Sequence, residues 1–343
     1  MRAVSFDGYG ETPTLGSWPD PSPPEDGVVV AVGATGVCRS DWHAWQGHDP
    51  VRLPHVPGHE LAGTVAAVGP LVRRWSVGDR VTVPFVCGCG VCETCREGDT
   101  HVCPHQTQPG FTGPGSFADL VALQAADTNL VRLPGSLDDV TAAALGCRLA
   151  TSYRAVVTHG RLRPGDRLAV HGCGGVGLSA VAVGVALGAR VVAVDVSPAA
   201  AERARALGAE AAVTGSGDAA EAVRDLTGGG AHVSLDAVGT PATAAASVRS
   251  LRRRGRHVQV GLLLGEHSAA ALPMDRVVAQ ELEIHGSHGM PAHQYGELLD
   301  LVASGRLDPR RLVGRVVGLE DAGAALAAMS GPAQTVGMTV VRL

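Results

Sequence analysis

A glycine-rich segment in the middle of the chain constrains the fold most strongly. Gly172, Gly174 and Gly177 form the pattern G-x-G-x-x-G, which follows a short valine-rich apolar run and precedes an apolar stretch of helical length. A strand, a tight turn and a helix in this order form the phosphate-binding turn of a dinucleotide-binding βαβ unit. The pattern alone is weak in a chain with 46 glycines, so the prediction depends on this context.

The residues of this turn have distinct physical roles. Gly172 permits the tight turn, Gly174 lets the backbone approach a pyrophosphate, and Gly177 lets the helix pack closely on the strand. With Gly175 and Val176, they form a helix N-terminus whose free N–H groups and partial positive charge attract phosphate. The segment is therefore predicted to bind a dinucleotide, the alternative being an ordinary glycine-rich turn.

An acidic residue after the next strand indicates which dinucleotide is bound. Asp195 ends that strand, 18 residues after Gly177. Its carboxylate can accept hydrogen bonds from both adenosine ribose hydroxyls and would repel a 2′-phosphate. No arginine lies close behind it, since the first is Arg203. NAD is therefore expected in preference to NADP.

The pattern of apolar residues changes near residue 150, which suggests two domains in a chain of 343 residues. The earlier part contains short strand-like runs divided by Gly and Pro, typical of a β-rich barrel or sandwich. The later part alternates strands and helices, which predicts an α/β, doubly wound parallel sheet. The expected early strands are Val28–Gly36, Leu61–Val68 and Arg80–Val86. The expected later elements are strands Arg167–His171, Ala189–Val194, Val233–Asp236 and His257–Val260, with helices Val176–Leu187 and Pro198–Leu207. From about Gly289 the chain could rejoin the first domain.

Composition excludes several classes of function. The net charge of −5 argues against a nucleic-acid partner. All 28 basic residues are arginine, so lysine chemistry is excluded. The N-terminus has no apolar run typical of a signal peptide, and the longest apolar stretch, Ala180–Leu187, is too short to span a membrane. A cytoplasmic location is the default expectation, and the eight cysteines are then expected to be metal ligands or free thiols.

Four cysteines are closely spaced in the pattern C-x2-C-x2-C-x7-C. Four thiolates on one small lobe are the ligands of a closed, structural zinc site. These cysteines are Cys89, Cys92, Cys95 and Cys103. Cys87 and Cys89 could exchange roles, but the set starting at Cys89 keeps the spacing even and leaves Cys87 as a spare thiol. Buried cysteines without a metal are the alternative.

A second group of potential ligands is dispersed along the chain. It comprises Cys38, the adjacent His59 and Glu60, and Cys147 just before the dinucleotide-binding part. Cys38 could be a small core residue and His59 a structural histidine. Their spacing leaves a second metal site and an ordinary core equally open.

Taken together, these motifs resemble the medium-chain, zinc-containing alcohol dehydrogenase family over essentially the whole chain. Cys38–His43 (C-R-S-D-W-H) and Gly58–Glu60 (G-H-E) match its catalytic segments. The four-cysteine lobe, Cys147 followed by Thr151, and the glycine turn with Asp195 complete the resemblance in the family's order. The resemblance implies a GroES-like catalytic domain over 1–147 and 289–343, with a zinc lobe at about 87–104. It implies a Rossmann NAD-binding domain over 148–288.

The resemblance also implies two zinc ions per chain. Cys38, His59 and Cys147 would be the catalytic ligands, leaving the fourth position open for an alcohol. Glu60 resembles a carboxylate that some members bring into the coordination sphere. Some branches of the family place an acidic residue where this chain has Cys147, which favours simple alcohols, aldehydes or ketones as substrates. The absence of a long insertion favours a homotetramer over a homodimer.

The expected reaction is hydride transfer between an alcohol and NAD. Zinc would bind the alcohol oxygen as an alkoxide by lowering its pKa. Ser40 would take the proton and pass it through the nicotinamide ribose to His43. Asp41 would orient His59. The alternative roles are a helix N-cap for Ser40 and a solvated carboxylate for Asp41.

Three further residues receive roles from the resemblance. Arg39 would pair with the cofactor pyrophosphate, Thr151 would touch the nicotinamide, and Phe85 would form an aromatic wall for the substrate. Their ordinary alternatives are a surface arginine, a helix cap and a packing residue. Two other functions also fit the fold: a zinc-free reductase of the quinone oxidoreductase type and a non-enzymatic binding protein.

Overall fold

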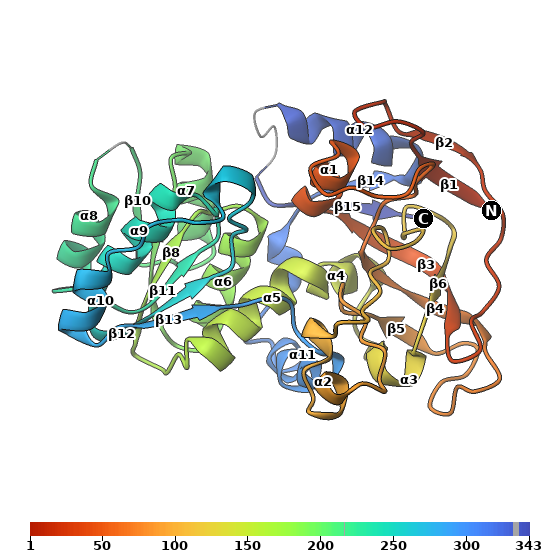
Figure 1. Ribbon diagram of the computed structural model, residues 1–343, viewed down its shortest axis with the longest axis horizontal. Coiled ribbons are helices and arrows are strands. Elements are labelled where there is room, and N and C mark those ends of the chain that lie inside the picture. Colours follow the sequence, from red (N-terminus) through yellow and green to blue (C-terminus); the bar gives the residue numbers. More distant parts are fainter. Residues whose placement is uncertain (216, 332–335) are drawn as a thin grey trace. The chain divides into compact units, whose positions relative to one another are not determined.

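The computed structural model describes residues 1–215, 217–331 and 336–343, which form two compact units (Figure 1). Unit 1 comprises Met1–Ala150, Gly289–Leu299 and Pro309–Leu343. Unit 2 comprises Thr151–His288 and Asp300–Asp308. The chain therefore leaves unit 1 after Ala150, builds most of unit 2, and then returns to unit 1.

Unit 2 contains a parallel sheet with the strand order β10-β9-β8-β11-β12-β13. Numbered from β8, this is the order 3-2-1-4-5-6 of a Rossmann fold, so the predicted doubly wound α/β sheet is confirmed. Its central strands are apolar and buried because helices cover both faces. The strands are β8 (Arg167–His171), β9 (Arg190–Val194), β10 (Ala211–Val213), β11 (Ala231–Asp236), β12 (Leu251–Gln259) and β13 (Glu283–Gly286).

The helices of unit 2 begin at residues that satisfy their first N–H groups. The Ser197 hydroxyl accepts from Ala200 N at 3.3 Å, and proline follows as the first helical residue. The same arrangement recurs at Thr240. Asp218 accepts from two backbone N–H groups at the start of the helix Ala219–Leu226. The helices are α6 (Gly175–Ala186), α7 (Pro198–Ala206), α8 (Ala219–Leu226), α9 (Pro241–Arg249) and α10 (Met274–Gln280), while α5 (Ala150–Arg154) lies at the junction with unit 1.

Unit 1 is built around a mixed sheet with the order β14-β15-β3-β4-β5-β7, and β6 also pairs with β3. Strands β1 and β2 form a separate antiparallel pair. The expected strand Arg80–Val86 is too long, because β5 ends at Thr82 and Pro84, which follows, has no N–H to donate. The strands are β1 (Arg2–Ser5), β2 (Thr14–Ser17), β3 (Val28–Val37), β4 (Glu60–Val68), β5 (Arg80–Thr82), β6 (Leu120–Leu123), β7 (Val131–Arg132), β14 (Val313–Gly318) and β15 (Met338–Arg342).

The long strand β3 contributes to two hydrophobic cores of unit 1. Val28, Val30 and Val32 pack in one core with Trp75, and Val37 packs in the other. The helices of this unit are short and lie around the sheet: α1 (Arg39–Trp45), α2 (Glu93–Arg96), α3 (Ala126–Asn129), α4 (Asp139–Ala143), α12 (Ala322–Ala327) and α11 (Tyr295–Ala303), whose last residues belong to unit 2. Across the described ranges, no helix has the length and hydrophobicity needed to cross a membrane.

Candidate active site and metal centres

The dispersed ligand candidates of the sequence lie together in unit 1. Cys38 immediately precedes α1, and His59 immediately precedes Glu60, the first residue of β4. Cys147 lies in a π-helical turn over Leu145–Leu149. One potential ligand atom from each of the four residues lies within 4.8 Å of the others. A set of two sulfur atoms, one imidazole nitrogen and a carboxylate oxygen suits zinc.

The orientation of His59 leaves one ring nitrogen available for a ligand. His59 Nδ1 lies 2.8 Å from Asp41 Oδ1, so the ring donates its Nδ1–H to the carboxylate. The lone pair then resides on Nε2, which is buried and has no hydrogen-bond partner among the described residues. A buried nitrogen without a partner is costly in a folded protein, and a metal ion at this position would satisfy it.

A single buried carboxylate connects the two segments that carry Cys38 and His59. Asp41 Oδ1 also accepts from Gly58 N at 3.0 Å, and Oδ2 accepts from Cys38 N at 2.9 Å. Asp41 is fully buried, and its contact with the Cys38 N–H also caps helix α1. It therefore holds two of the potential ligands, Cys38 and His59, at fixed positions.

Arg148 is a residue of this site that sequence reasoning missed. Its backbone N and its Nε each lie 3.0 Å from Glu60 Oε1, and its Nη2 pairs with Glu60 Oε2. Both side chains are buried, so the ion pair lies in a low-dielectric interior. An alanine Cβ at Gly36 would lie 2.2 Å from Glu60 Oε2, so the glycine leaves room for the pair. Glu60 is thus held by Arg148 beside the other potential ligands.

The thiols of the cluster affect one another's ionisation. A hydrogen bond from Cys147 is the largest cause that holds the pKa of Cys38 well below its ordinary value, and His59 adds to the effect. Conversely, the pKa of Cys147 is raised, first by Cys38 and then by burial. One thiolate is therefore favoured even without a cation, and a bound cation would favour the second.

The four-cysteine lobe also forms a compact cluster, whose four sulfur atoms lie within 4.8 Å of one another. Cys89 Sγ lies 4.0 Å from Cys95 Sγ, and Cys92 Sγ lies 3.7 Å from Cys103 Sγ. Four ligands about 2.3 Å from one zinc ion at tetrahedral angles are separated by about 3.8 Å. The lobe therefore fits a closed four-thiolate site.

Backbone N–H groups around this lobe favour the thiolate of Cys89, whereas burial raises the pKa of Cys95 to about 12. Those of Val91 and Cys92 are the main causes that lower the pKa of Cys89 to about 6. Cys103 Sγ accepts from His105 N at 3.3 Å. Negative sulfur that accepts backbone hydrogen bonds is the form in which cysteine binds metal.

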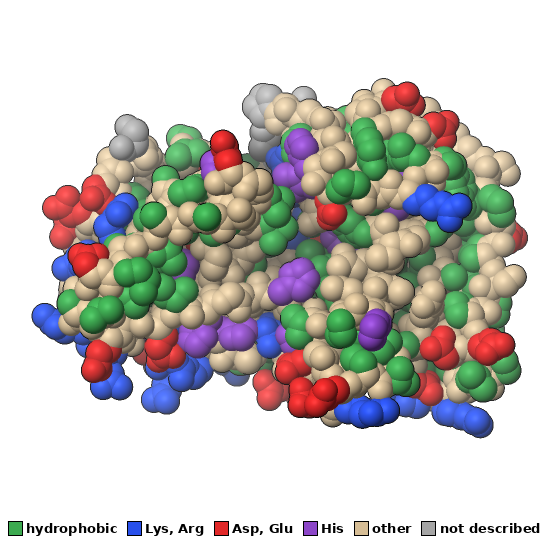
Figure 2. All heavy atoms as spheres, in the orientation of Figure 1, with side chains coloured by type: hydrophobic (Ala, Val, Ile, Leu, Met, Phe, Trp, Pro, Cys, Tyr) green, Lys and Arg blue, Asp and Glu red, His purple; other side chains and the backbone are tan. Residues whose placement is uncertain are grey.

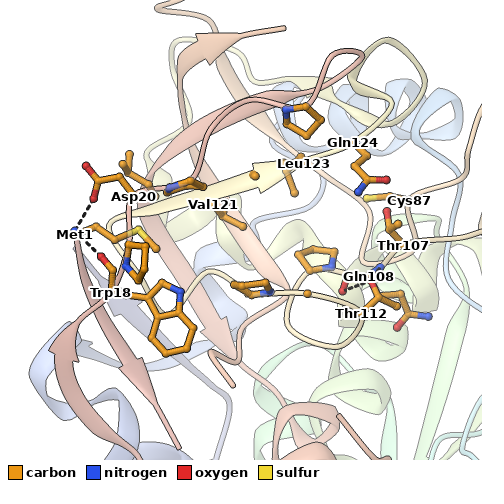
Figure 3. A pocket seen from close by; sticks show the side chains of 18 residues that line it. Met1, Trp18, Asp20, Cys87, Thr107, Gln108, Thr112, Val121, Leu123 and Gln124 are labelled. Carbon is orange, nitrogen blue, oxygen red and sulfur yellow. Dashed lines mark hydrogen bonds and ion pairs between the residues drawn. The ribbon is translucent and has the colours of Figure 1, made fainter. Parts of the chain in front are cut away.

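Cys87 lies outside both clusters. It is buried and donates its thiol to Pro84 O, and burial raises its pKa to about 12. It lines a separate cavity of about 410 Å³ whose wall includes Trp18, Gln108 and strand β6 (Figure 3). None of the predicted site residues lines this cavity.

The predicted relay residues lie on the first turns of α1. Ser40 Oγ lies 3.9 Å from Cys38 Sγ, so the hydroxyl is adjacent to the cluster. His43 Nδ1 lies 3.2 Å from Nδ1 of the exposed His48, so one ring donates to the other. Burial and then the charge of His48 lower the pKa of His43. His43 is thus linked to the surface through a second imidazole.

Three other predicted or missed residues surround this site in unit 1. Phe85 lies beside His59, with ring centroids 6.1 Å apart, and Phe111 lies closer, at 5.2 Å. Phe111 was missed because it comes from a loop between glycines that carries no periodic signal. Arg39 donates to Met329 O at 2.7 Å and lies over the Trp42 ring, so its guanidinium is held against unit 1.

The glycine turn in unit 2 has little free space at two of its glycines and much at the third. Gly172 has φ +92°, a backbone conformation that favours glycine. A Cβ at Gly177 would lie 1.7 Å from Gly172 O, which no side chain can tolerate. A Cβ at Gly174 would have no neighbour within 4 Å, so the backbone there is open to a ligand.

Asp195 lies beside this turn. Its Oδ2 accepts from Cys173 N at 2.6 Å, and its Oδ1 accepts from Ser197 N at 2.8 Å. A carboxylate has about four acceptor sites, so capacity remains for ribose hydroxyls. In the same unit, the hydroxyl of Thr151 is buried and has no partner within the described part of the chain.

Comparison with known proteins gives the family. Residues 24–135 match the alcohol dehydrogenase GroES-like domain, and residues 175–304 match the zinc-binding dehydrogenase domain. An alcohol dehydrogenase from Geobacillus stearothermophilus is 34% identical over 289 residues, 83% of each chain. The chain therefore belongs to the medium-chain, zinc-containing alcohol dehydrogenase family, a group of oxidoreductases.

The similarity to solved structures of other proteins covers the whole chain. Alcohol dehydrogenase TADH from Thermus sp. ATN1 has a TM-score of 0.92 and 31% identity, covering 100% of this chain and 99% of its own. A putative zinc-binding dehydrogenase from Sinorhizobium meliloti 1021, bound to NADP, has a TM-score of 0.89 and 28% identity, with coverage of 100% and 99%. Both similarities confirm the predicted combination of a GroES-like and a Rossmann domain.

Proposed function

We propose that this chain is a zinc-dependent, NAD-linked alcohol dehydrogenase that interconverts a small alcohol and its aldehyde or ketone. The observation that carries the proposal is His59 Nε2, which is buried beside the Cys38 and Cys147 thiols and has no hydrogen-bond partner in the part of the chain that the structure describes. These three residues would hold the catalytic zinc and leave its fourth position open for the substrate, with the Glu60 carboxylate held beside them by Arg148. Cys89, Cys92, Cys95 and Cys103 would hold a second, structural zinc.

The bound groups supply the chemistry that the side chains lack: zinc acts as a Lewis acid toward the substrate oxygen, and the nicotinamide accepts or donates hydride. The chain's own residues place and protect that chemistry. Asp41 orients His59 and keeps its Nδ1 protonated, so that Nε2 remains a ligand. Phe85 and Phe111 cover His59 with apolar rings, which exclude water beside the substrate and favour a nonpolar substituent on it.

The chain also supplies two groups for proton transfer. Ser40, adjacent to Cys38, would exchange a proton with the substrate hydroxyl. His43 would exchange it with solvent, because its ring is hydrogen-bonded to the exposed His48. Since its pKa is lowered by burial, His43 is neutral at pH 7 and able to accept a proton during alcohol oxidation.

Unit 2 would bind NAD through its glycine turn. The open backbone at Gly174 supports close approach of a pyrophosphate, and the Thr151 hydroxyl, which has no partner among the residues described, would contact the cofactor. Asp195 favours NAD, because it would repel a 2′-phosphate. A structurally similar zinc-binding dehydrogenase is bound to NADP, so titration with both cofactors tests this preference.

The metal assignment is tested by the zinc content of purified variants. We expect two zinc ions per wild-type chain and one in Cys147→Ser, with loss of alcohol oxidation in the variant. Cys87→Ser is the matched control, because Cys87 is buried but belongs to neither cluster, and it should keep both ions and the activity. One zinc in the wild type after reconstitution, or full activity of Cys147→Ser, would refute the proposal.

Cofactor choice is tested by fluorescence titration with NADH and NADPH. We expect tighter binding of NADH in the wild type, and a relative gain for NADPH in Asp195→Ser because the repelling charge is removed. Equal selectivity in the two proteins would refute the role of Asp195. Turnover with a panel of primary and secondary alcohols then identifies the substrate.

We further propose a homotetramer in the cytoplasm. The cytoplasmic location is supported by the eight cysteines, which are all free thiols in the structure, six of them grouped as potential metal ligands. Light scattering coupled to size exclusion measures the assembly, and a homodimer is the alternative outcome.

A further inference from the structure

A second cavity, of about 300 Å³, lies in unit 2 and is lined mainly by arginine. Its residues are Arg163, Asp166, His232, Arg252, Arg253, Arg254 and Arg256, and we refer to it as the arginine cavity. These residues come from the segment before β8 and from the first residues of β11 and β12. The cavity therefore lies at the N-terminal ends of the parallel strands. The glycine turn follows the C-terminal end of β8, so the proposed cofactor site lies at the opposite ends of these strands.

Positive charge in the arginine cavity is only partly compensated. Arg254 lies 3.6 Å from Glu281, and Arg256 lies 3.5 Å from Glu283. Arg163, Arg252 and Arg253 form no ion pair within the described ranges, and Asp166 is the one carboxylate in the lining. Figure 2 shows basic side chains gathered along the edge of unit 2 below β12 and β13. Because the chain has no lysine, the cations that an anion would meet here are guanidinium groups, which bind phosphate oxygens in pairs.

The backbone of β12 directs successive arginines to the same side. Leu251 pairs with Ala231, but the next pair joins Arg256 to Val233, so residues 252–255 form a bulge. In a regular strand, neighbouring side chains point to opposite faces, whereas in this bulge Arg252, Arg253 and Arg254 all line one cavity. The bulge thus concentrates charge that a regular strand would divide.

A hydrogen-bonding conflict in the cavity points to a missing acceptor. His232 Nδ1 accepts from Arg167 N at 3.0 Å, which places the ring proton of the neutral imidazole on Nε2. His232 Nε2 lies 2.6 Å from Arg252 Nη1, which is also a donor. The nearest carboxylate oxygen, on Asp166, is 3.7 Å away. Two donors therefore converge without an acceptor, and an anion oxygen would accept from both.

We propose that the arginine cavity binds a small multivalent phosphate, either free pyrophosphate or the phosphate chain of a nucleotide. The convergence of several guanidinium groups with an imidazole N–H in one compact space matches a ligand with several charged oxygens close together. The overall charge of −5 disfavours a long polyanion such as nucleic acid. This site is separate from the proposed NAD site and does not depend on it.

The test is isothermal titration of the zinc-loaded full chain with pyrophosphate, in the presence of saturating NADH so that the glycine turn is filled. We expect one pyrophosphate per chain and a weakening of about tenfold or more in the double variant Arg252→Gln, Arg253→Gln, because charge-assisted hydrogen bonds are lost. Arg205→Gln removes a half-exposed arginine of the same unit outside the cavity and should leave the affinity within about twofold. Arg163→Gln changes the lining of the cavity on a different segment, and it should also weaken pyrophosphate binding.

Two readouts locate the ligand. The His232 ring resonances should shift on titration of the wild type, and in the double variant they should shift only at correspondingly higher pyrophosphate concentration; circular dichroism of the variant confirms folding. Comparison of ATP with tripolyphosphate distinguishes the source, because tighter ATP binding identifies a nucleotide and equal binding identifies free polyphosphate. No heat of binding at millimolar pyrophosphate, equal weakening in Arg205→Gln, or tighter binding of single-stranded DNA than of either phosphate would overturn the proposal.

Discussion

Two glycines of the same turn, Gly177 and Gly174, allow the requirement for folding to be separated from the requirement for cofactor binding. A Cβ at Gly177 would lie 1.7 Å from Gly172 O, whereas Cβ contacts under 3.0 Å essentially do not occur, so about 1.3 Å of movement is needed. The atom that must move belongs to the backbone of Gly172, whose N–H is bonded to Val194 O at 2.8 Å. The strain therefore falls on the junction of β8 and β9.

The expected cost follows from comparing this strain with the intrinsic benefit of alanine. Alanine in place of glycine gains up to about 1 kcal/mol through helix propensity and reduced freedom of the unfolded chain. Forcing an extra group into a packed interior costs about 1–3 kcal/mol, and more where backbone must move. Because the contact at Gly177 is with backbone, we expect Gly177→Ala to lower the free energy of unfolding by about 2 kcal/mol.

Gly174→Ala is the matched control. Its Cβ meets no atom within 4 Å, and its φ of −74° suits any residue, so its stability should stay within about 0.5 kcal/mol of the wild type. Urea unfolding is best followed by far-ultraviolet circular dichroism, since the tryptophans, Trp18, Trp42, Trp45 and Trp75, all lie in unit 1. If the proposed NAD site is correct, Gly174→Ala binds NADH at least about tenfold more weakly, since a methyl group would occupy the pyrophosphate's approach. A Gly177→Ala variant as stable as the wild type would refute the packing argument, and unchanged NADH affinity in Gly174→Ala would refute the binding argument.

Three further predictions follow from other side chains. Asp41→Asn removes the carboxylate that orients His59, so zinc affinity at the dispersed cluster should fall about 10- to 100-fold in chelator competition, and an unchanged affinity would contradict the role of Asp41. Cys173 is buried, and burial, followed by the charge of Asp195, raises the pKa of its thiol to about 12, so very little of the reactive thiolate is present at pH 8. An alkylating reagent should therefore modify Cys173 only after unfolding, as measured by mass spectrometry. Rapid labelling of Cys173 in the native protein would contradict its burial. Burial lowers the pKa of His171 to about 3, whereas the same ring in the unfolded chain has a pKa of about 6.5. As the pH falls from about 6.5 toward about 3, the unfolded state takes up a proton that the folded state does not, so the free energy of unfolding decreases over this range. His171→Gln should therefore flatten the decline of stability between pH 6 and pH 4 in urea titrations, whereas a parallel decline would show that other groups dominate.

The distances between paired residues explain why part of the site was missed. Glu60 and Arg148 are 88 residues apart, and their ion pair forms only when the π-helical turn that contains Cys147 packs against β4. Arg148 has no sequence feature that marks it as buried, because arginine is usually exposed and this chain has 28 of them. Phe111 was missed for the related reason that isolated loop residues carry no periodic pattern.

Strand boundaries show the same limit. The bounds of strands β3, β8 and β9 are predicted within one residue at each end, because their apolar runs are continuous and bounded by clear breaks. In contrast, β12 begins at Leu251 rather than His257, since its first half is a run of arginines that reads as a solvated loop. The bulge in that half, which creates the arginine cavity, follows from pairing with β11 and not from local preference.

The sequence by itself determined the local features of this protein. It indicated the strand–turn–helix at Gly172–Gly177, the closely spaced cysteines and the change from β-rich to alternating structure, because each depends on residues near one another in the chain. Only the tertiary structure decided that Asp41 also accepts from the backbones of Cys38 and Gly58, that His59 Nε2 has no hydrogen-bond partner among the described residues, and that three arginines share one cavity. These features depend on which strands and turns pack together, a choice made by the burial of apolar surface over the whole domain rather than by any single segment.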